Sequence, residues 1–285
     1  TFKFFTFLWL PAAFMGISVK IFAILGPLHL FLQFWYHTRL IDKMGILEYI
    51  LVTPSHHRVH HAINPEYLDK NYSQIFIIWD KLFGTFQVEL DNVKPVYGTL
   101  RPSSTWNPII INYKHLIQLI KDAWHTNNMI DKLKIWFMPT GWRPLDVIVH
   151  YPITYIEDPY SQVKYKTDNS NILLGWTWLQ YMIAVFLMFH LFIIIPDYNI
   201  YMYYFYALFL FMHIFSFTST LDYKFYAIAA DFLKVILGIS VIYYQNYSWF
   251  GLGQLFVIIF IIYFFLSFYL TCYFYNKNKL LRCAN

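Results

Sequence analysis

Histidines are concentrated at one place in this 285-residue chain. Residues 53–61 read Thr-Pro-Ser-His-His-Arg-Val-His-His, so four of the eleven histidines fall within six consecutive positions. Another histidine, His37, lies twenty residues upstream of His57. Neutral imidazole is the commonest metal ligand among protein side chains. The spacing therefore predicts a metal centre rather than four independently packed histidines.

The residues before the cluster predict how it is arranged. Thr53 and Pro54 have the types favoured at a helix N-cap and at the first helical position. A helix that begins there places His57, His60 and His61 at positions i, i+3 and i+4, on one face that spans about 100°. His56 lies at the edge of that arc, where it could be a ligand, a partner of the ligands or a bystander.

The chemistry of the donors narrows the choice of metal. The only cysteines are Cys272 and Cys283, near the other end of the chain, so neither a disulfide framework nor a CxxC zinc site is expected. A site of imidazole nitrogens with added oxygen suits non-haem iron, and zinc or copper is also compatible with the ligand type.

The composition indicates an integral membrane protein. Hydrophobic residues make up 58% of the chain and charged residues only 13%, whereas soluble domains carry about 25% charged residues. Aromatic residues reach 22%, which suits many positions at membrane–water interfaces. The net charge of +5 comes without a long basic run, so a nucleic-acid partner is not expected.

Four apolar stretches predict membrane-spanning helices in the C-terminal part, at about 172–195, 201–219, 226–244 and 250–274. Each is close to the ~20 residues needed to cross a bilayer. Residues 1–36 form a fifth apolar region, which leaves a spanning pair and a re-entrant hairpin open. The predicted fold class is an all-α integral membrane protein, a multi-span helical bundle with a histidine-box metal site.

Two charged residues interrupt the third apolar stretch. Asp231 and Lys234 are three positions apart, so they would share one helix face and could pair there. A functional site, an internal ion pair and an interfacial helix are the three interpretations, and the functional site is the least favoured. The isolated His190 and His213 are expected to pack or to form hydrogen bonds in the apolar helices.

The central segment, residues 37–171, is predicted to be the aqueous, catalytic part. Between 38 and 171 there are 14 Lys and Arg and 13 Asp and Glu residues. The short tail, 275–285, is basic, whereas the loops near 196–200 and 245–249 contain no Lys or Arg. By the positive-inside rule, the tail and the histidine cluster face the cytosol. The expected organisation is 1–36 membrane helices, 37–171 catalytic segment, 172–274 four spans and 275–285 tail.

Several segments together resemble the fatty acid hydroxylase (sterol desaturase) superfamily. They are residues 33–38 (Gln-Phe-Trp-Tyr-His-Thr), the 53–61 cluster, residues 69–72 (Asp-Lys-Asn-Tyr) and residues 78–86 (Ile-Trp-Asp-Lys-Leu-Phe-Gly-Thr-Phe). The strong resemblance covers about residues 30–100. The helices after 172 match only in hydrophobic character and placement.

The resemblance implies a di-iron centre held by histidine boxes in the endoplasmic-reticulum membrane, with the active site facing the cytosol. It implies an enzyme that uses oxygen and tetrahydrobiopterin to hydroxylate the ether-linked alkyl carbon of an alkylglycerol, giving an aldehyde and a glycerol derivative. Carried over by position, His57, His60 and His61 match the last HxxHH box and His37 the histidine before it. Asn71 and Asp80 match motif positions, where they would support the ligands or serve turns and caps.

The chain also departs from the pattern of the superfamily. An HxxxH-type pair, an earlier HxxHH box and an acidic residue beside the first box are expected, but none occurs before His37. Because the chain begins at Thr1 without an initiator Met, an N-terminally truncated sequence is expected, with this chain inactive alone. Two alternatives stay open: a sterol or fatty acyl hydroxylase or desaturase, and a catalytically incomplete membrane protein.

Overall fold

A computed structural model describes residues 10–139 and 141–284 of the chain. The first nine residues of the predicted 1–36 membrane region, and the side chains of Arg282 and Cys283, lie outside the described residues. Every regular element in the described part is helical, and extended backbone pairs only as isolated bridges, such as Leu51 with Phe76. The all-α fold class is thus confirmed for these residues.

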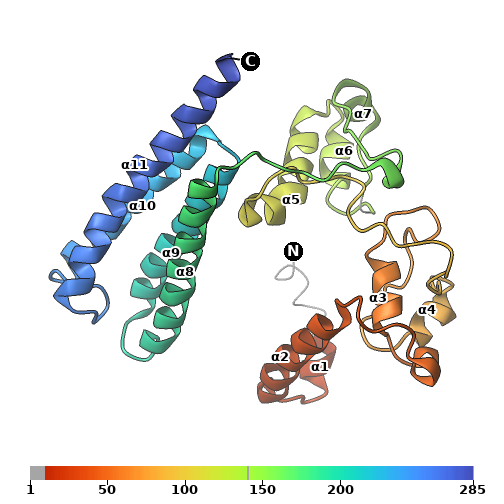
Figure 1. The fold of residues 1–285 in the computed structure, drawn as a ribbon. Helices are drawn as coiled ribbons and strands as arrows, with labels where there is room; N and C mark the ends of the chain where they lie inside the picture. The colour runs from red at the N-terminus through yellow and green to blue at the C-terminus, as the bar shows by residue number, and fades with distance from the viewer. Residues whose placement is uncertain (1–9, 140, 285) are drawn as a thin grey trace. The chain divides into compact units, whose positions relative to one another are not determined.

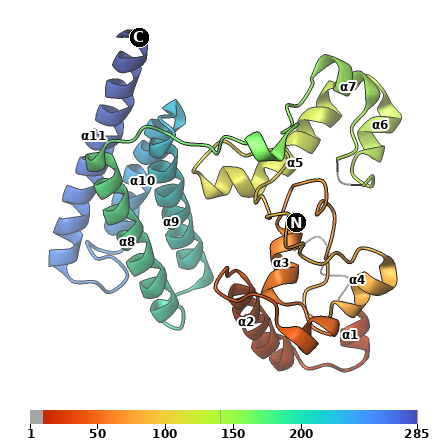
Figure 2. The same cartoon turned by 45° about the vertical axis from the view of Figure 1, so that its right-hand side comes forward.

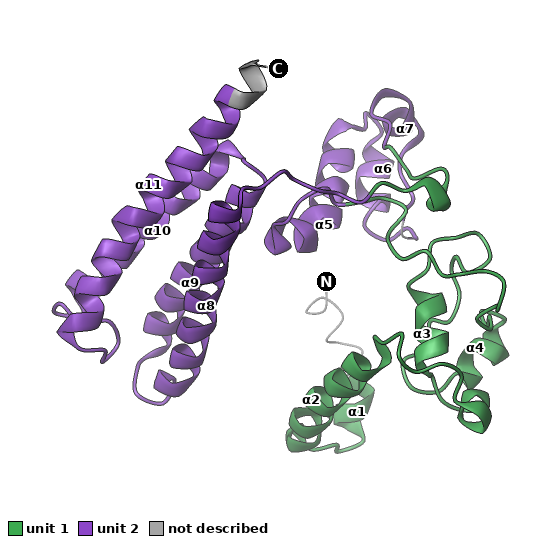
Figure 3. Cartoon of the chain, in the orientation of Figure 1, with its two compact units in different colours: residues 1–102, 154–163 green, residues 103–153, 164–285 purple. Residues whose placement is uncertain are grey.

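The chain divides into two compact units (Figure 3). Unit 1 comprises residues 1–102 and 154–163, and unit 2 comprises residues 103–153 and 164–285. The predicted domain boundaries at 36, 171 and 274 are not tested by this division and stay a prediction.

Unit 1 contains one long helix and three short ones, joined by loops (Figure 1). Its helices are α1 (Leu10–Phe14), α2 (Val19–Tyr36), α3 (Pro54–His60) and α4 (Ile78–Phe83), with 3-10 turns at Gly45–Tyr49 and Pro159–Ser161. Around α3, the buried side chains of Val59, Ala62 and Tyr67 form a small core. The Tyr67 hydroxyl donates to the Val93 carbonyl at 2.6 Å, which fixes the loop beside α3.

Unit 2 begins with three helices that precede the membrane segment. They are α5 (Pro108–His125), α6 (Met129–Lys134) and α7 (Leu145–His150). Arg143 binds the buried Asp122 carboxylate, with Nε to Oδ2 at 2.6 Å and the second guanidinium nitrogen to Oδ1 at 2.9 Å. A two-pronged pair of this kind fixes geometry as well as charge, so it holds the loop after α6 against the end of α5.

Four long apolar helices follow, and they lie side by side in Figures 1 and 2. They are α8 (Asn171–Ile194), α9 (Ile200–Leu221), α10 (Phe225–Tyr244) and α11 (Gln254–Ala284). Together with α2, they make five helices in the described part that are long and apolar enough to cross a membrane. The prediction of a multi-span helical membrane protein is therefore confirmed. The bounds of α8, α9 and α10 lie within two residues of the predicted stretches, whereas α11 begins four residues later than the fourth stretch and ends ten residues later.

The core of this bundle is aromatic and tightly packed. Tyr206 and Phe209 of α9 contact Trp249, and Phe209 also contacts Phe264 of α11. A Cβ atom added at Gly238 of α10 would lie 2.5 Å from a ring carbon of Phe264. Glycine is therefore needed at this crossing, because any side chain would separate α10 from α11.

A buried polar network also crosses the bundle, centred on the pair predicted from the sequence. Lys234 Nζ lies 2.5 Å from Asp231 Oδ1, and both side chains are fully buried. Ser216 of α9 and Ser267 of α11 donate to the same oxygen at 2.7 and 3.0 Å. The pairing of Asp231 with Lys234 is confirmed, and it is an internal ion pair.

The isolated histidines of the bundle have the expected structural partners. His213 Nε2 lies 2.9 Å from the carbonyl oxygen of Gln180, and its Nδ1 lies 3.1 Å from the Tyr263 hydroxyl. His190 Nδ1 lies 3.0 Å from the Tyr206 hydroxyl. Both histidines therefore serve hydrogen bonding between helices, as their isolation predicted.

Candidate metal centre

The helix that carries the histidine cluster begins where the sequence predicts. Thr53 is the N-cap of α3 and Pro54 its first residue. The Thr53 backbone N–H donates to His56 Nδ1 at 3.4 Å, which is half of a capping box made with histidine in place of Glu or Gln. His56 is 1% exposed and faces this cap, so it stabilises the start of the helix.

Three imidazoles converge on one point from α3 and from the end of α2. The Nε2 atoms of His37, His57 and His61 form a triangle whose edges are 3.0 Å (His37–His57), 3.0 Å (His57–His61) and 3.1 Å (His37–His61). His57 lies on α3, and His61, one turn later, is the C-cap of that helix, whereas His37 is the C-cap of α2. Among the described residues, these three histidines form a group whose ligand atoms lie close enough together to hold one metal ion.

The edges of the triangle match the distances between three neighbouring ligand nitrogens in an octahedral metal site. Three nitrogens that each lie about 2.1 Å from one ion, at right angles to one another, are about 3.0 Å apart. Half of an octahedral site has this shape. The other ligands of such an ion would come from beyond these three histidines.

Hydrogen bonding alone does not account for the triangle. His37 Nδ1–H donates to the Gln33 carbonyl at 2.8 Å, so its Nε2 offers a lone pair only. A neutral imidazole nitrogen is either a donor or an acceptor, and three mutual contacts cannot all be hydrogen bonds. A cation on the common face would satisfy all three lone pairs, so the donor set fits a metal.

The electrostatics keep His57 and His61 neutral. Burial first, and then the neighbouring imidazoles of His61, His37 and His60, lower the pKa of His57 to about 3. Burial followed by the same kind of neighbours also lowers the pKa of His61. A neutral imidazole is the form that binds a metal, so these two histidines are ready to bind at physiological pH.

His60 lies beside the triangle rather than in it. Its ring stacks on His57 with 5.6 Å between centroids and meets the edge of Tyr72 at 6.2 Å. The structure therefore brings together three of the four predicted ligands, His37, His57 and His61. The assignment of His60 as a ligand, and that of His56 as a possible one, stay predictions.

The sequence did not predict Arg58 as a site residue, because its position on the helix places it off the face that carries His57, His60 and His61. Its guanidinium makes a two-pronged contact with Glu89, at 2.7 to 3.0 Å. The remaining terminal nitrogen donates to the carbonyls of Thr38 at 3.1 Å and Ile41 at 2.7 Å. Arg58 thus ties α3 to the segment that follows His37, and it sets the distance between the two sources of ligands.

Asn71 connects the backbone of α3 to a neighbouring loop through side-chain hydrogen bonds. Its side-chain amide donates to the carbonyls of His56 at 3.2 Å and Gln87 at 2.8 Å, and its oxygen accepts from the Gln87 N–H at 2.9 Å. The backbone at Asn71 is left-handed, with φ of 53°, a conformation that asparagine tolerates. Asn71 therefore holds backbone around the cluster and touches no ligand nitrogen itself.

Asp80 organises the neighbouring turn. Its carboxylate accepts from the N–H groups of Tyr72 at 2.8 Å and Ser73 at 2.9 Å and from the Thr85 hydroxyl at 2.6 Å. Burial alone would raise the pKa of Asp80, but these hydrogen bonds outweigh it and hold the pKa below its ordinary value. The supporting roles predicted for Asn71 and Asp80 are compatible with these contacts and stay predictions.

Comparison with known proteins supports the resemblance seen in the sequence. Residues 1–85, which include the whole histidine triangle, match the model of the fatty acid hydroxylase family. The chain is 37% identical over 174 residues to alkylglycerol monooxygenase of Homo sapiens, an alignment that covers 61% of this chain and 38% of the relative. No solved structure matches the chain.

Two further relatives carry the same name. The alkylglycerol monooxygenase of Xenopus tropicalis is 43% identical over 138 residues, which cover 48% of this chain and 30% of the relative. That of Danio rerio is 41% identical over 128 residues, which cover 45% and 28%. The predicted resemblance is confirmed, and the chain spans between 28% and 38% of the length of these relatives.

Proposed function

We propose that the protein is an iron- and oxygen-dependent monooxygenase that hydroxylates the ether-linked alkyl carbon of alkylglycerols. The hemiacetal formed in this way separates into an aldehyde and a glycerol derivative. One observation carries the proposal: three imidazole nitrogens with the dimensions of a metal face lie inside the segment that matches the fatty acid hydroxylase family.

In this proposal, His37, His57 and His61 hold one iron. Protein side chains cannot oxidise an unactivated C–H bond beside an ether oxygen, and bound iron supplies the activation of dioxygen that this requires. A di-iron centre needs donors beyond these three, and His60 and His56 are the candidates on α3. Tetrahydrobiopterin is the proposed reductant.

The other residues of the site would act by positioning. The Gln33 carbonyl fixes the tautomer of His37, so that Nε2 points its lone pair at the common face. Arg58, paired with Glu89, holds the segment just after His37 at a fixed distance from α3. Because catalysis depends on the geometry of the ligands, these contacts would matter although they touch no reacting atom.

The apolar helices would hold the enzyme in the membrane, where its lipid substrate is also dissolved. Large apolar side chains such as Phe192 (59% exposed) and Ile193 (72% exposed) cover the surface of α8, as expected of a helix that faces lipid. An alkylglycerol dissolves in the same membrane and would reach the protein by lateral diffusion. We place the protein in the endoplasmic-reticulum membrane because of its resemblance to the fatty acid hydroxylase superfamily. The positive-inside rule puts the histidine cluster on the cytosolic side.

The test is turnover in isolated membranes that contain the protein. With an alkylglycerol, oxygen and tetrahydrobiopterin, we expect release of a fatty aldehyde, and none from His57→Ala inserted at the same level. Turnover of a sterol or a fatty acyl chain with a cytochrome b5-type electron donor would instead favour the related hydroxylases. Zinc without iron, and no turnover, would indicate a non-catalytic membrane protein.

A further inference from the structure

The helix α5 exposes a continuous apolar face. Positions i, i+3, i+4, i+7 and i+11 share one side of a helix, and in α5 these positions carry five exposed side chains: Tyr113, Leu116, Ile117, Ile120 and Trp124. Ile120 is 51% exposed and Trp124 is 81% exposed. Single apolar residues at a surface are normal, but a continuous apolar face marks contact with a partner or a membrane. This face therefore needs an occupant.

The opposite, polar face of α5 is the one that packs within unit 2. The buried Asp122 carboxylate binds the Arg143 guanidinium and accepts a hydrogen bond from the Gln118 amide at 2.6 Å. Just after the helix, Thr126 is also buried, and its hydroxyl donates to the Asp146 carboxylate at 3.0 Å. A helix on the surface of a soluble domain buries its apolar stripe instead. The inversion indicates that the outer side of α5 is suited to apolar surroundings.

The short helix α6 also carries exposed apolar side chains. Met129, Ile130 and Leu133 of this helix are exposed, and so is Phe137, one turn after Leu133. The exposed apolar surface in this part of unit 2 therefore extends beyond a single helix. An isolated surface residue does not explain a surface of this extent.

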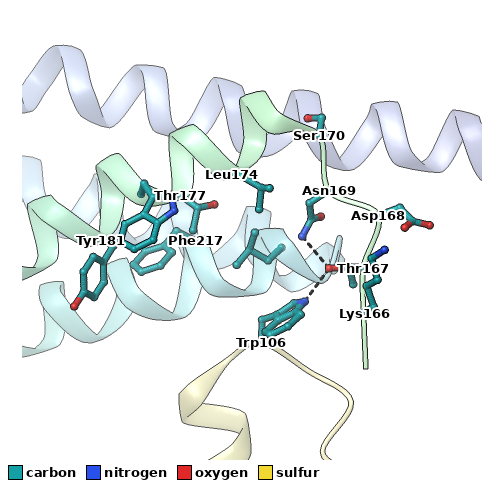
Figure 4. Close-up of a pocket in the computed structure, with 12 residues that line it drawn as sticks. Trp106, Lys166, Thr167, Asp168, Asn169, Ser170, Leu174, Thr177, Tyr181 and Phe217 are labelled. Atoms are coloured by element: carbon teal, nitrogen blue, oxygen red, sulfur yellow. Dashed lines mark hydrogen bonds between the residues drawn. The ribbon is translucent and has the colours of Figure 1, made fainter. Parts of the chain in front are cut away.

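The residues just before α5 fix its start at one end of the membrane spans. The side-chain amide of Asn107, the N-cap of α5, donates to the Ser219 hydroxyl of α9 at 2.7 Å. The Trp106 N–H donates to the Asp222 carboxylate at 3.1 Å, and the Trp106 indole donates to the Thr167 hydroxyl at 2.8 Å (Figure 4). Asp222 follows α9 and Thr167 precedes α8, so both mark the same end of these two candidate spans. The helix α5 therefore begins where these spans leave the hydrocarbon.

The charges of α5 suit a helix that lies on a membrane rather than one that crosses it. The helix carries Lys114, Lys121 and Asp122, and it is not among the five candidate spans. Lys114 and Lys121 are seven positions apart, so they lie along the same edge of the apolar face. A lysine at such an edge keeps its ammonium among lipid headgroups while its stem lies against apolar groups. An apolar face with Trp and a basic border is typical of interfacial helices.

We propose that α5 lies on the bilayer surface at this end of α8 and α9, with Ile117, Ile120 and Trp124 inserted among the upper parts of the lipid acyl chains. The bilayer is the apolar phase adjacent to the start of α5, and the basic border matches the phosphates of lipid headgroups in charge. These two observations favour lipid over a second copy of the chain or another protein. The inference rests on the membrane spans and is independent of the metal chemistry proposed for unit 1.

The test is the depth of α5 in the membrane. The whole chain, with Cys272→Ser and Cys283→Ser, is given one new cysteine that carries a nitroxide spin label, and it is reconstituted as single copies in nanodiscs of phosphatidylcholine and phosphatidylglycerol. Electron paramagnetic resonance then compares collisions of the label with oxygen, which concentrates in lipid, and with a polar nickel chelate, which stays in water. We expect labels at Ile117→Cys and Ile120→Cys to be accessible to oxygen and shielded from the chelate.

Two further positions calibrate the measurement. Met182→Cys, at an exposed position in the middle of α8, gives the values for lipid, and His115→Cys, exposed on the other side of α5, gives those for water. Across the exposed positions of α5, the ratio of oxygen to chelate collisions should follow the helical period of about 3.6 residues. Chelate access at Ile120→Cys equal to that at His115→Cys would place the face in water. Shielding of Ile120→Cys from both reagents would mean that protein covers it, and either result overturns the proposal.

Discussion

The histidine triangle of unit 1 and the polar network of the α8–α11 bundle are both clusters of titratable groups, but they are built in opposite ways. In the bundle, unlike groups meet: the Lys234 ammonium lies against the Asp231 carboxylate, with Ser216 and Ser267 beside them. In the triangle, like groups meet, because three imidazole nitrogens face one another at 3.0 to 3.1 Å. The first arrangement balances its charges within the chain, although Asp231 Oδ2 accepts no hydrogen bond from the described residues. The second arrangement needs a cation from outside.

This difference separates a structural cluster from a binding site. Ionisable residues in a membrane segment are functional candidates by default, whereas the triangle lies at the start of the segment that the sequence predicts to be aqueous. Burial and charge would therefore favour the bundle as the site. The triangle is nevertheless the better candidate, because its facing nitrogens have no complementary partners among the described residues, whereas Lys234 is paired with Asp231. Substitutions in both places can test this criterion.

The largest effect on metal binding is expected from a ligand of the triangle. His57→Ala should lower the affinity for iron by more than about 100-fold, the upper end of the loss seen for residues behind the ligands, because it removes one of three donors. Isothermal titration with iron under anaerobic conditions measures the change. His60→Ala should cost less than His57→Ala, and His115→Ala, an exposed histidine on α5, should cost nothing. Equal loss in all three variants would contradict a local site.

The bundle should respond to the loss of one partner and tolerate the loss of both. Lys234→Met leaves the Asp231 carboxylate buried without its counter-ion, so we expect a loss of about 3–5 kcal/mol in the free energy of unfolding. The double variant with Asp231→Leu should recover most of that loss, since it removes both charges. Thermal unfolding in detergent measures both variants, and a double variant as unstable as Lys234→Met would show that the pair itself is required.

A positioning residue should have an intermediate effect on the metal. Arg58→Lys keeps the charge but loses the two-pronged contact with Glu89 and a carbonyl contact of the segment after His37, so iron affinity should fall by about tenfold. The matched control is Lys43→Gln, which breaks the exposed ion pair of Lys43 with Asp91 and should leave iron affinity unchanged. An Arg58→Lys protein that binds iron as tightly as the unmodified protein would show that Arg58 does not position the ligands.

The effect expected at Asp80 is on the stability of the fold, and it depends on pH. Its pKa in the folded protein lies below the ordinary value of 3.8, so its charge stabilises the fold fully above pH 3.8. That contribution is lost as the pH falls through the lower, folded value. Asp80→Asn should therefore be less stable than the unmodified protein by about 1.5–3 kcal/mol at pH 7. The gap should close as the pH falls through the folded value of Asp80. A gap that stays constant down to low pH, in chemical unfolding followed by tryptophan fluorescence, would contradict this role.

The sequence predicted the helices and the core of the site because both follow from short-range patterns. The Thr53-Pro54 start fixed the register of α3, and this register placed His57 and His61 one turn apart. The apolar stretches predicted α8 to α11 because their length is set by the membrane. The Asp231–Lys234 pair was predictable for the same reason, since three residues on a helix place two side chains on one face.

The remaining features depend on contacts between distant residues. The role of Arg58 required Glu89 and the carbonyls of Thr38 and Ile41, which no helical periodicity connects. The separation of His60 from the triangle depends on where α2 ends relative to α3. The cavity at the start of α8 (Figure 4) depends on the hydrogen bond from Trp106 to Thr167, two residues that are 61 positions apart in the chain. Long-range packing of this kind carries no signal in a single sequence.

The central claim is that His37, His57 and His61 share one metal ion, and metal content tests it most directly. The purified, detergent-solubilised protein and its three single alanine variants would be loaded with ferrous iron, desalted and analysed by inductively coupled plasma mass spectrometry. We predict that the unmodified protein retains iron and that each variant loses it, while His115→Ala retains it. Iron retained equally by all the alanine variants, or by none of the proteins including the unmodified one, would contradict the claim.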